Sequence, residues 1–195
     1  MPPGIIHTSH DLFPKYAYLC AMDFSRIKAI TFDVDGVMTD GSLLQMDNGD
    51  LLRTFNAKDT FAVRMAATNG IKVGVFTGGC TPGIKARFLT CMVPEDDIHM
   101  GCRGKLPLIE AFCEKYGISL EEVLYVGDDI PDLPAVRAAG IGVAPADAAP
   151  EVRAAADYVS PFHGGRGCIR DCVEKVMKAT GKWSFGEDYC YEKVY

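Results

Sequence analysis

Two aspartates, Asp33 and Asp35, lie two residues apart directly after the apolar run 29–32. Such a run predicts a strand buried in a parallel sheet, and ligands of these sheets bind at the carboxyl ends of the strands. Two carboxylates this close repel each other unless a cation or a shared proton lies between them, and Mg²⁺ prefers oxygen ligands of this kind. The pair therefore predicts a Mg²⁺ site, although a strand followed by an acidic turn would show the same residues.

Two later segments bring groups that suit an anion. Thr77 follows the apolar run 71–76, and Gly78 and Gly79 leave their backbone amides open to approach. Lys105 stands at the start of an expected helix, where backbone amides and the helix dipole also favour negative charge. Taken singly, the threonine could be a helix cap and the lysine a solvated surface charge.

Three more aspartates, Asp128, Asp129 and Asp132, follow the apolar run 123–126. Alone they could be acidic residues at a helix N-terminus. Because the carboxyl ends of parallel strands meet at one edge of a sheet, we expect them to lie beside the polar residues described above. Four such groups in this order are hard to obtain by chance and predict a single site.

These residue types suit phosphoryl transfer through a covalent intermediate. Asp33 can attack phosphorus to form an aspartyl phosphate, and Asp35 can protonate the leaving alkoxide and then deprotonate the attacking water. Asp33, Asp128 and the backbone carbonyl of Asp35 would hold Mg²⁺. Thr77 and Lys105 would bind the phosphoryl oxygens. Two further aspartates, Asp129 and Asp132, would orient Lys105 or the metal-bound water.

Strand-like and helical patterns alternate along the chain. Strands are expected over 29–32, 71–76, 97–100, 123–126, 141–144 and 158–160, and helices over 57–69, 82–92, 105–116, a segment ending at 139, 151–156 and 168–180. This alternation predicts an α/β fold, a doubly wound parallel sheet with helices on both faces. Asn48-Gly49 between the apolar runs 42–46 and 51–55 predicts a small β-hairpin insertion. The chain then divides into an N-terminal extension (1–26), one domain without a cap domain (27–180) and a C-terminal tail (181–195).

The composition narrows the classes of partner. The 195 residues carry a formal net charge of −6, which argues against a surface for nucleic acid or an anionic membrane. No apolar stretch is long enough to span a bilayer, and the N-terminus lacks a secretory signal pattern. Eight cysteines without a Cys-x-x-Cys motif are expected to be free thiols. We therefore expect a cytoplasmic protein that acts on a small molecule.

Over about residues 27–180 the chain resembles the haloacid dehalogenase superfamily of phosphotransferases. The segments that carry the resemblance are Asp33-Val34-Asp35-Gly36-Val37, Thr77-Gly78, Lys105 and Gly127-Asp128-Asp129-Ile130-Pro131-Asp132. The resemblance implies the Rossmann-like fold of that superfamily and a Mg²⁺-dependent hydrolase. A receiver-like switch that accepts phosphate is the alternative outside enzymes, but a receiver carries its phosphate on a middle strand, and here that strand ends in Thr77.

A closer resemblance is to the 3-deoxy-D-manno-octulosonate 8-phosphate phosphatase family. It is carried by the missing cap domain and by Gly36-Val37-Met38-Thr39-Asp40-Gly41, Phe55-Asn56-Ala57-Lys58-Asp59 and Gly164-Gly165-Arg166-Gly167. It implies a phosphorylated sugar acid as substrate, and its expected binding residues are Asn56, Asp59, Arg64, Gly78 and Arg87. Because relatives act on nine-carbon acids of sialic-acid type, a nine-carbon acid 9-phosphate is the alternative substrate.

One position departs from that family, which usually has arginine where this chain has Gly79. The missing guanidinium removes a bidentate partner for a carboxylate. We expect an arginine placed there to improve turnover of the octulosonate phosphate, unless Arg87 or Lys85 already fills the role.

The resemblance also implies a homotetramer in which one subunit covers the active site of the next. The hairpin has apolar residues on both arms, Leu43, Leu44, Met46, Leu51 and Leu52. An isolated hairpin is only marginally stable, so we expect these side chains to pack on neighbouring subunits rather than on their own core. The tail 181–195 is a candidate to reach a neighbour's cleft.

Overall fold

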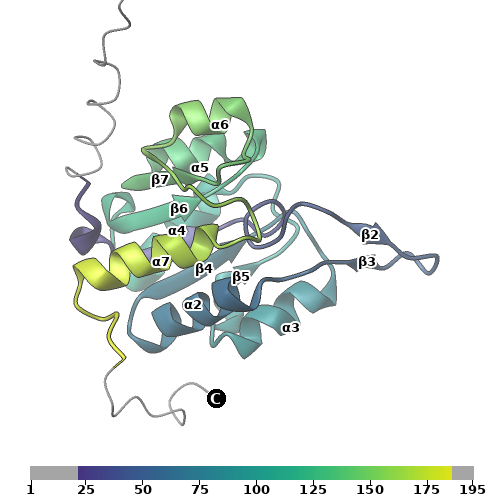
Figure 1. The fold of residues 1–195 in the computed structure, drawn as a ribbon, viewed down its shortest axis with the longest axis horizontal. Coiled ribbons are helices and arrows are strands. Elements are labelled where there is room, and N and C mark those ends of the chain that lie inside the picture. The colour runs from purple at the N-terminus through teal and green to yellow at the C-terminus, as the bar shows by residue number, and fades with distance from the viewer. Residues whose placement is uncertain (1–21, 186–195) are drawn as a thin grey trace, which may run out of the picture.

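The computed structural model describes residues 22–185, and they form one parallel sheet with helices on both faces (Figure 1). The six-stranded sheet has the order β5-β4-β1-β6-β7-β8. Its strands are β1 (Ala29–Phe32), β4 (Lys72–Phe76), β5 (Ile98–His99), β6 (Val123–Val126), β7 (Ile141–Ala144) and β8 (Tyr158–Val159). The helices are α2 (Ala57–Thr68), α3 (Pro82–Thr90), α4 (Leu106–Tyr116), α5 (Leu133–Ala138), α6 (Pro150–Ala155) and α7 (Cys168–Ala179). The predicted α/β class is confirmed.

Strand β1 lies at the centre of the sheet, between β4 and β6. Side chains alternate between its faces, so Ile30 and Phe32 join one apolar cluster and Ala29 the other. The first cluster is closed by residues of α2, α3 and α7, and the second by residues of α4, α5 and α6. Burial on both faces explains why every residue of β1 is apolar or, at Thr31, fully enclosed.

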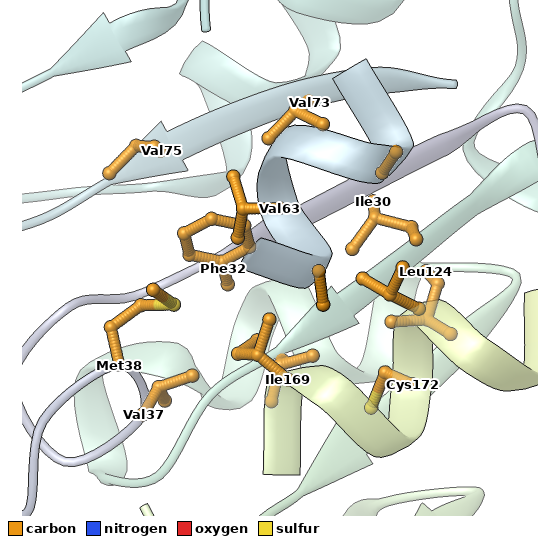
Figure 2. Close-up of a cluster of buried hydrophobic side chains, with 14 of the residues drawn as sticks. Ile30, Phe32, Val37, Met38, Val63, Val73, Val75, Leu124, Ile169 and Cys172 are labelled. Carbon is orange, nitrogen blue, oxygen red and sulfur yellow. The ribbon is translucent and has the colours of Figure 1, made fainter. Parts of the chain in front are cut away.

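The loop that carries the two early aspartates is anchored in the first cluster. Val34, Val37 and Met38 have no exposed surface. Figure 2 shows Val37 and Met38 turned into the same apolar cluster as Phe32 and Ile169 of α7. Apolar residues interleaved with the polar ones therefore hold the loop in one conformation, and the carboxylates are left on its outer side.

Several boundaries differ from the sequence prediction by a few residues. The helix expected from 105 begins at Leu106, with Lys105 at its N-cap position. The segment after Asp129 begins as a 3₁₀ turn, Ile130–Asp132, before α5, because Pro131 and Pro134 have no N–H to donate. Strand β5 is shorter than expected, as is β8.

The predicted hairpin is present as β2 (Leu44–Gln45) and β3 (Leu51–Leu52), which pair antiparallel. It projects from the domain next to the carboxyl edge of the sheet (Figure 1). Leu44 is 62% exposed and Leu52 51% exposed, so the hairpin does not fold back on its own core.

The six cysteines that the structure describes are free thiols, as expected. No helix within residues 22–185 has the length and apolar character needed to cross a bilayer. Residues 1–21 of the predicted extension and 186–195 of the predicted tail lie outside the described residues.

Candidate active site

Asp33 follows β1 directly and meets Lys105, which the start of α4 brings to the same edge of the sheet. Lys105 Nζ lies 2.8 Å from Asp33 Oδ2 and 2.6 Å from Asp132 Oδ1. The lysine is buried, and burial alone would lower its pKa, but the charges of the two aspartates outweigh this and raise the pKa. Lys105 therefore stays a cation, which suits a group that binds phosphoryl oxygens.

Asp132 is fully occupied by hydrogen-bond donors. Its Oδ1 accepts from Lys105 and from the Tyr125 hydroxyl at 2.5 Å, and its Oδ2 accepts from the backbone amides of Asp128 at 3.0 Å and Asp129 at 3.3 Å. A carboxylate with this many donors has little capacity left for a metal. Asp132 thus accepts hydrogen bonds from Lys105 and from Tyr125, a partner that the sequence did not reveal.

The carboxylate of Asp128, unlike that of Asp132, has an oxygen without a hydrogen-bond donor in the part of the chain that the structure describes. Its Oδ1 is buried and meets no hydrogen-bond donor among the described residues. Burial, followed by the charges of Asp132 and Asp33, raises the pKa of Asp128 to about 8. Oxygens of these three aspartates lie within 4.8 Å of one another. An unpartnered oxygen beside a second carboxylate fits a divalent cation, so Asp33 and Asp128 suit Mg²⁺ as predicted.

Gly36 permits Asp128 to reach this place. Its φ is +86°, and a Cβ built there would lie 2.0 Å from Asp128 Oδ2. Gly164, from the loop before α7, packs on the other side, because its Cβ would lie 1.9 Å from the carbonyl oxygen of Gly36. Gly165 N donates to the carbonyl of Val37 at 2.9 Å. The motif at 164–167 therefore supports the loop that carries Asp33 and Asp35.

Thr77 follows β4 directly and lines a cavity of about 390 Å³ together with Asp33, Lys105 and Asp128. Its Oγ1 accepts a hydrogen bond from Gly79 N at 3.1 Å, which fixes the turn. The residues that line the cavity are Asp33, Asp35, Gly41, Thr77, Gly78, Gly79, Cys102, Lys105, Asp128, Asp129, Pro131 and Asp132. All the predicted catalytic and metal-binding residues are thus brought together, and Gly78 lies with them.

Asp35 also lines this cavity, but its carboxylate is bound by Arg53, a residue that the sequence analysis missed. Arg53 Nε lies 2.6 Å from Asp35 Oδ1, and Arg53 Nη2 lies 2.9 Å from Asp35 Oδ2. The available signal was that Arg53 is the only cationic residue in the hairpin segment 42–55.

Two residues expected at the substrate have other partners. Asn56 is the N-cap of α2, where its Oδ1 accepts from Lys58 N at 2.8 Å and its Nδ2 donates to the carbonyl of Gly165 at 3.2 Å. Asp59 is buried, and its carboxylate accepts from the backbone amides of Gly167 at 3.0 Å and Arg170 at 2.8 Å. The structure therefore directs Asp59 to the N-terminus of α7 and away from the catalytic cavity.

Arg64 and Arg87 do not line the catalytic cavity either. They lie together in a separate cavity of about 250 Å³ between α2 and α3, where Arg87 donates to the Thr60 hydroxyl. Arg87 also lines a cavity of about 420 Å³ that it shares with Arg53. Any contact of Arg87 with a substrate would be made from this neighbouring space.

Comparisons with known proteins show which family the chain is similar to. A family model described as haloacid dehalogenase-like hydrolase matches residues 104–168. The 3-deoxy-D-manno-octulosonate 8-phosphate phosphatase KdsC of Escherichia coli (strain K12) is 36% identical over 156 residues, which cover 80% of this chain and 82% of that protein. The phosphatase of the same name from Haemophilus influenzae is 35% identical over 162 residues, covering 81% and 87%.

Solved structures show the same likeness. A 3-deoxy-D-manno-octulosonate 8-phosphate phosphatase from Yersinia pestis has a TM-score of 0.79 and 31% identity, over 82% of this chain and 85% of that one. The phosphatase of that name from Moraxella catarrhalis, in complex with a magnesium ion, a phosphate ion and a KDO molecule, has a TM-score of 0.80 and 29% identity, over 87% and 95%. The chain therefore belongs to the haloacid dehalogenase-like hydrolases, in the family of the 3-deoxy-D-manno-octulosonate 8-phosphate phosphatases.

Proposed function

We propose that this chain is a Mg²⁺-dependent phosphatase that hydrolyses 3-deoxy-D-manno-octulosonate 8-phosphate through an aspartyl-phosphate intermediate. Membership of the family makes it a phosphoric monoester hydrolase rather than a receiver-like switch. The observation that carries the proposal is the arrangement around Lys105. A cation held between Asp33 and Asp132 faces the unpartnered oxygen of Asp128 in one cavity.

The residues of the cavity divide the work of binding phosphate. Asp33, Asp128 and the backbone carbonyl of Asp35 would hold Mg²⁺, which when bound neutralises charge on the phosphoryl oxygens. Lys105 and the hydroxyl of Thr77 would bind the remaining oxygens. Asp33 Oδ1 accepts a hydrogen bond from Val34 N at 2.6 Å, which fixes the orientation of the nucleophile.

Phosphoryl transfer would then proceed in two steps. Asp33 forms a bond to phosphorus while the bond from phosphorus to the sugar oxygen breaks, and Asp35 gives its proton to that oxygen. In the second step a water molecule attacks the phosphorus and passes its proton to Asp35, and the Asp33–phosphorus bond breaks. Inorganic phosphate is released, and both aspartates return to their starting forms.

The choice of sugar acid depends on the groups around the catalytic cavity. Sequence relatives named for the octulosonate phosphate support that substrate. Gly79 leaves no side chain where the family usually has arginine, and a nine-carbon acid 9-phosphate is kept as the second candidate. Asn56, Arg64 and Arg87 remain proposed substrate contacts.

Assembly is a further part of the proposal. The exposed Leu43, Leu44, Met46 and Leu52 form an apolar surface on a projecting hairpin. We propose that a homotetramer buries this surface and that a neighbouring subunit covers the open catalytic cavity, which would exclude water from the reaction. The free thiols favour a reducing compartment, the cytoplasm.

A phosphate-release assay tests the function. We expect the octulosonate 8-phosphate to be hydrolysed with Mg²⁺ and not with excess EDTA, and the Asp33→Asn variant to be inactive as a control. Hydrolysis of the nine-carbon phosphate with a higher kcat/KM would select the second substrate. A folded protein that releases no phosphate from any sugar-acid phosphate would refute the proposal.

A further inference from the structure

Arg53 joins the hairpin to the catalytic cavity through a fully formed pair with Asp35. Both oxygens of the carboxylate are bound, at 2.6 Å by Nε and at 2.9 Å by Nη2. Nη1 donates to the Thr81 hydroxyl at 2.8 Å and to the carbonyl of Leu51 at 3.4 Å. The arginine side chain is only 4% exposed, whereas that of Asp35 is 27% exposed. The guanidinium is thus held by three groups, and one of them is the proposed general acid and base.

Gly79 provides the space in which Arg53 lies. A Cβ built on Gly79 would be 3.0 Å from Arg53 Nη2 and 2.6 Å from Ile84 Cδ1. The backbone at Gly79 is not in the left-handed region, so the requirement for glycine there is one of space. Arg53 therefore occupies the place that a side chain at position 79 would take.

The pair forms the boundary between two cavities. Asp35 lines the catalytic cavity, and Arg53 lines the neighbouring cavity of about 420 Å³ together with Arg87. A phosphorylated acid with its phosphate beside Asp33 would have its organic part next to this boundary. The guanidinium that it meets already has a carboxylate in its bidentate position, which is the geometry that a second carboxylate could take over.

The pair also restricts Asp35. Each oxygen of Asp35 accepts from the guanidinium, which fixes the orientation of the carboxylate and leaves one lone pair on each oxygen for another partner. Opening of these contacts allows Asp35 to turn toward the leaving oxygen, where it would transfer a proton. A ligand that binds the Arg53 guanidinium in place of Asp35 would release the Asp35 carboxylate.

On the basis of the proposed phosphatase function, we propose that Arg53 is the receptor for the carboxylate of the substrate and that substrate binding exchanges Asp35 for this carboxylate. Asp35 is then free to act on the leaving group. A phosphate ester without a carboxylate leaves the Arg53–Asp35 pair closed. A carboxylate on the substrate should therefore change kcat as well as KM.

Three phosphate esters separate the effects. 6-Phosphogluconate and sorbitol 6-phosphate have the same carbon chain. The first carries a carboxylate at C1, and the second carries an alcohol there. p-Nitrophenyl phosphate has a leaving group that needs no proton, so its turnover does not depend on Asp35 as an acid. Each would be measured with the native protein and with Arg53→Met, Arg53→Lys and, as a matched control, Arg153→Met, which removes an exposed arginine of α6.

We expect the native protein to prefer the acid over the alcohol by about tenfold or more in kcat/KM, the effect of a charge-assisted bidentate contact. Arg53→Met should reduce this preference to about one, by raising KM for the acid and raising kcat for the alcohol, because Asp35 is then released with either ester. Arg53→Lys keeps the charge without the bidentate geometry and should restore part of the preference. Arg153→Met should behave as the native protein.

Equal losses on all three esters would overturn the proposal, because they would show that Arg53 only supports the fold. An unchanged acid preference in Arg53→Met would overturn it as well. If that variant does not fold, Gly79→Ala serves as a second test, because its methyl group would crowd the Arg53 guanidinium. It should also lower the preference for the acid. Native protein that hydrolyses no phosphate ester would refute the proposed function itself before any variant is compared.

Discussion

The Tyr125 hydroxyl and the Lys105 ammonium donate to the same oxygen of Asp132, at 2.5 Å and 2.6 Å. The same three residue types also meet away from the catalytic cavity, where Lys115 donates to one oxygen of Asp97 and Tyr116 to the other. The chain therefore contains an internal control for the effect of a tyrosine on an aspartate–lysine pair.

We expect Tyr125→Phe to lower kcat by about tenfold, because Asp132 loses one charge-assisted hydrogen bond and holds Lys105 less firmly. Tyr116→Phe should lower the thermal midpoint and leave kcat unchanged. Steady-state kinetics and thermal unfolding of both variants check this. Equal kcat values for the two variants would show that Tyr125 serves the core alone.

Asp33→Asn should abolish turnover, by a factor on the order of 10⁴ or more, and keep the fold. The amide has nearly the same shape but cannot attack phosphorus. Asp35→Asn should instead impair protonation of the leaving group, and rapid-quench detection of phosphoenzyme would separate the two. Full activity of a folded Asp33→Asn protein contradicts the mechanism.

The raised pKa of Asp128, about 8, gives the metal-free protein a pH-dependent stability. Between the ordinary carboxyl pKa and pH 8 the folded state holds a proton that the unfolded chain has lost, so stability falls as pH rises through this window. We expect the thermal midpoint in EDTA to be lower at pH 8 than at pH 5. Mg²⁺, or Asp128→Asn, should reduce this difference, and a midpoint that rises over the window would contradict the assignment.

Asp59→Ala should lower the free energy of unfolding rather than change substrate binding. Its carboxylate accepts two backbone amides at the start of α7, and their loss costs about 1–3 kcal/mol of the free energy of unfolding. Urea unfolding measures this loss, and KM of the folded variant should stay within about threefold of native. A large rise in KM with unchanged stability would return Asp59 to the substrate site that the family resemblance implies.

Gly79→Arg is expected to lower activity, which reverses the gain expected from the sequence alone. The first atom of the new side chain would already crowd Ile84 and the guanidinium of Arg53. The substitution should therefore displace Arg53 from Asp35 and lower kcat/KM for the acid substrate by about tenfold. A higher kcat/KM would mean that the two arginines can share the space.

The sequence predicted the sheet and the polar cluster at its carboxyl edge because both follow from local patterns. A buried run such as Ala29–Phe32 specifies a central strand, and aspartates just after it must lie at the carboxyl edge. The direction of a side chain on a helix is harder to infer, so Asp59 was assigned to the substrate although it faces α7. Arg53 was missed because its partner, Asp35, is distant in sequence and is reached only by the course of the hairpin.

The packing of Gly164 against Gly36 also bears on how the protein is made. The ribosome completes the loop that bears the nucleophile early, but the backbone that supports this loop is translated close to the end of the domain. Strand β1 likewise precedes both of its neighbours in the sheet, β4 and β6. A nascent chain that has exposed only its first half therefore holds Asp33 and Asp35 without the backbone that supports their loop, and we expect hydrolytic competence only near the completion of synthesis.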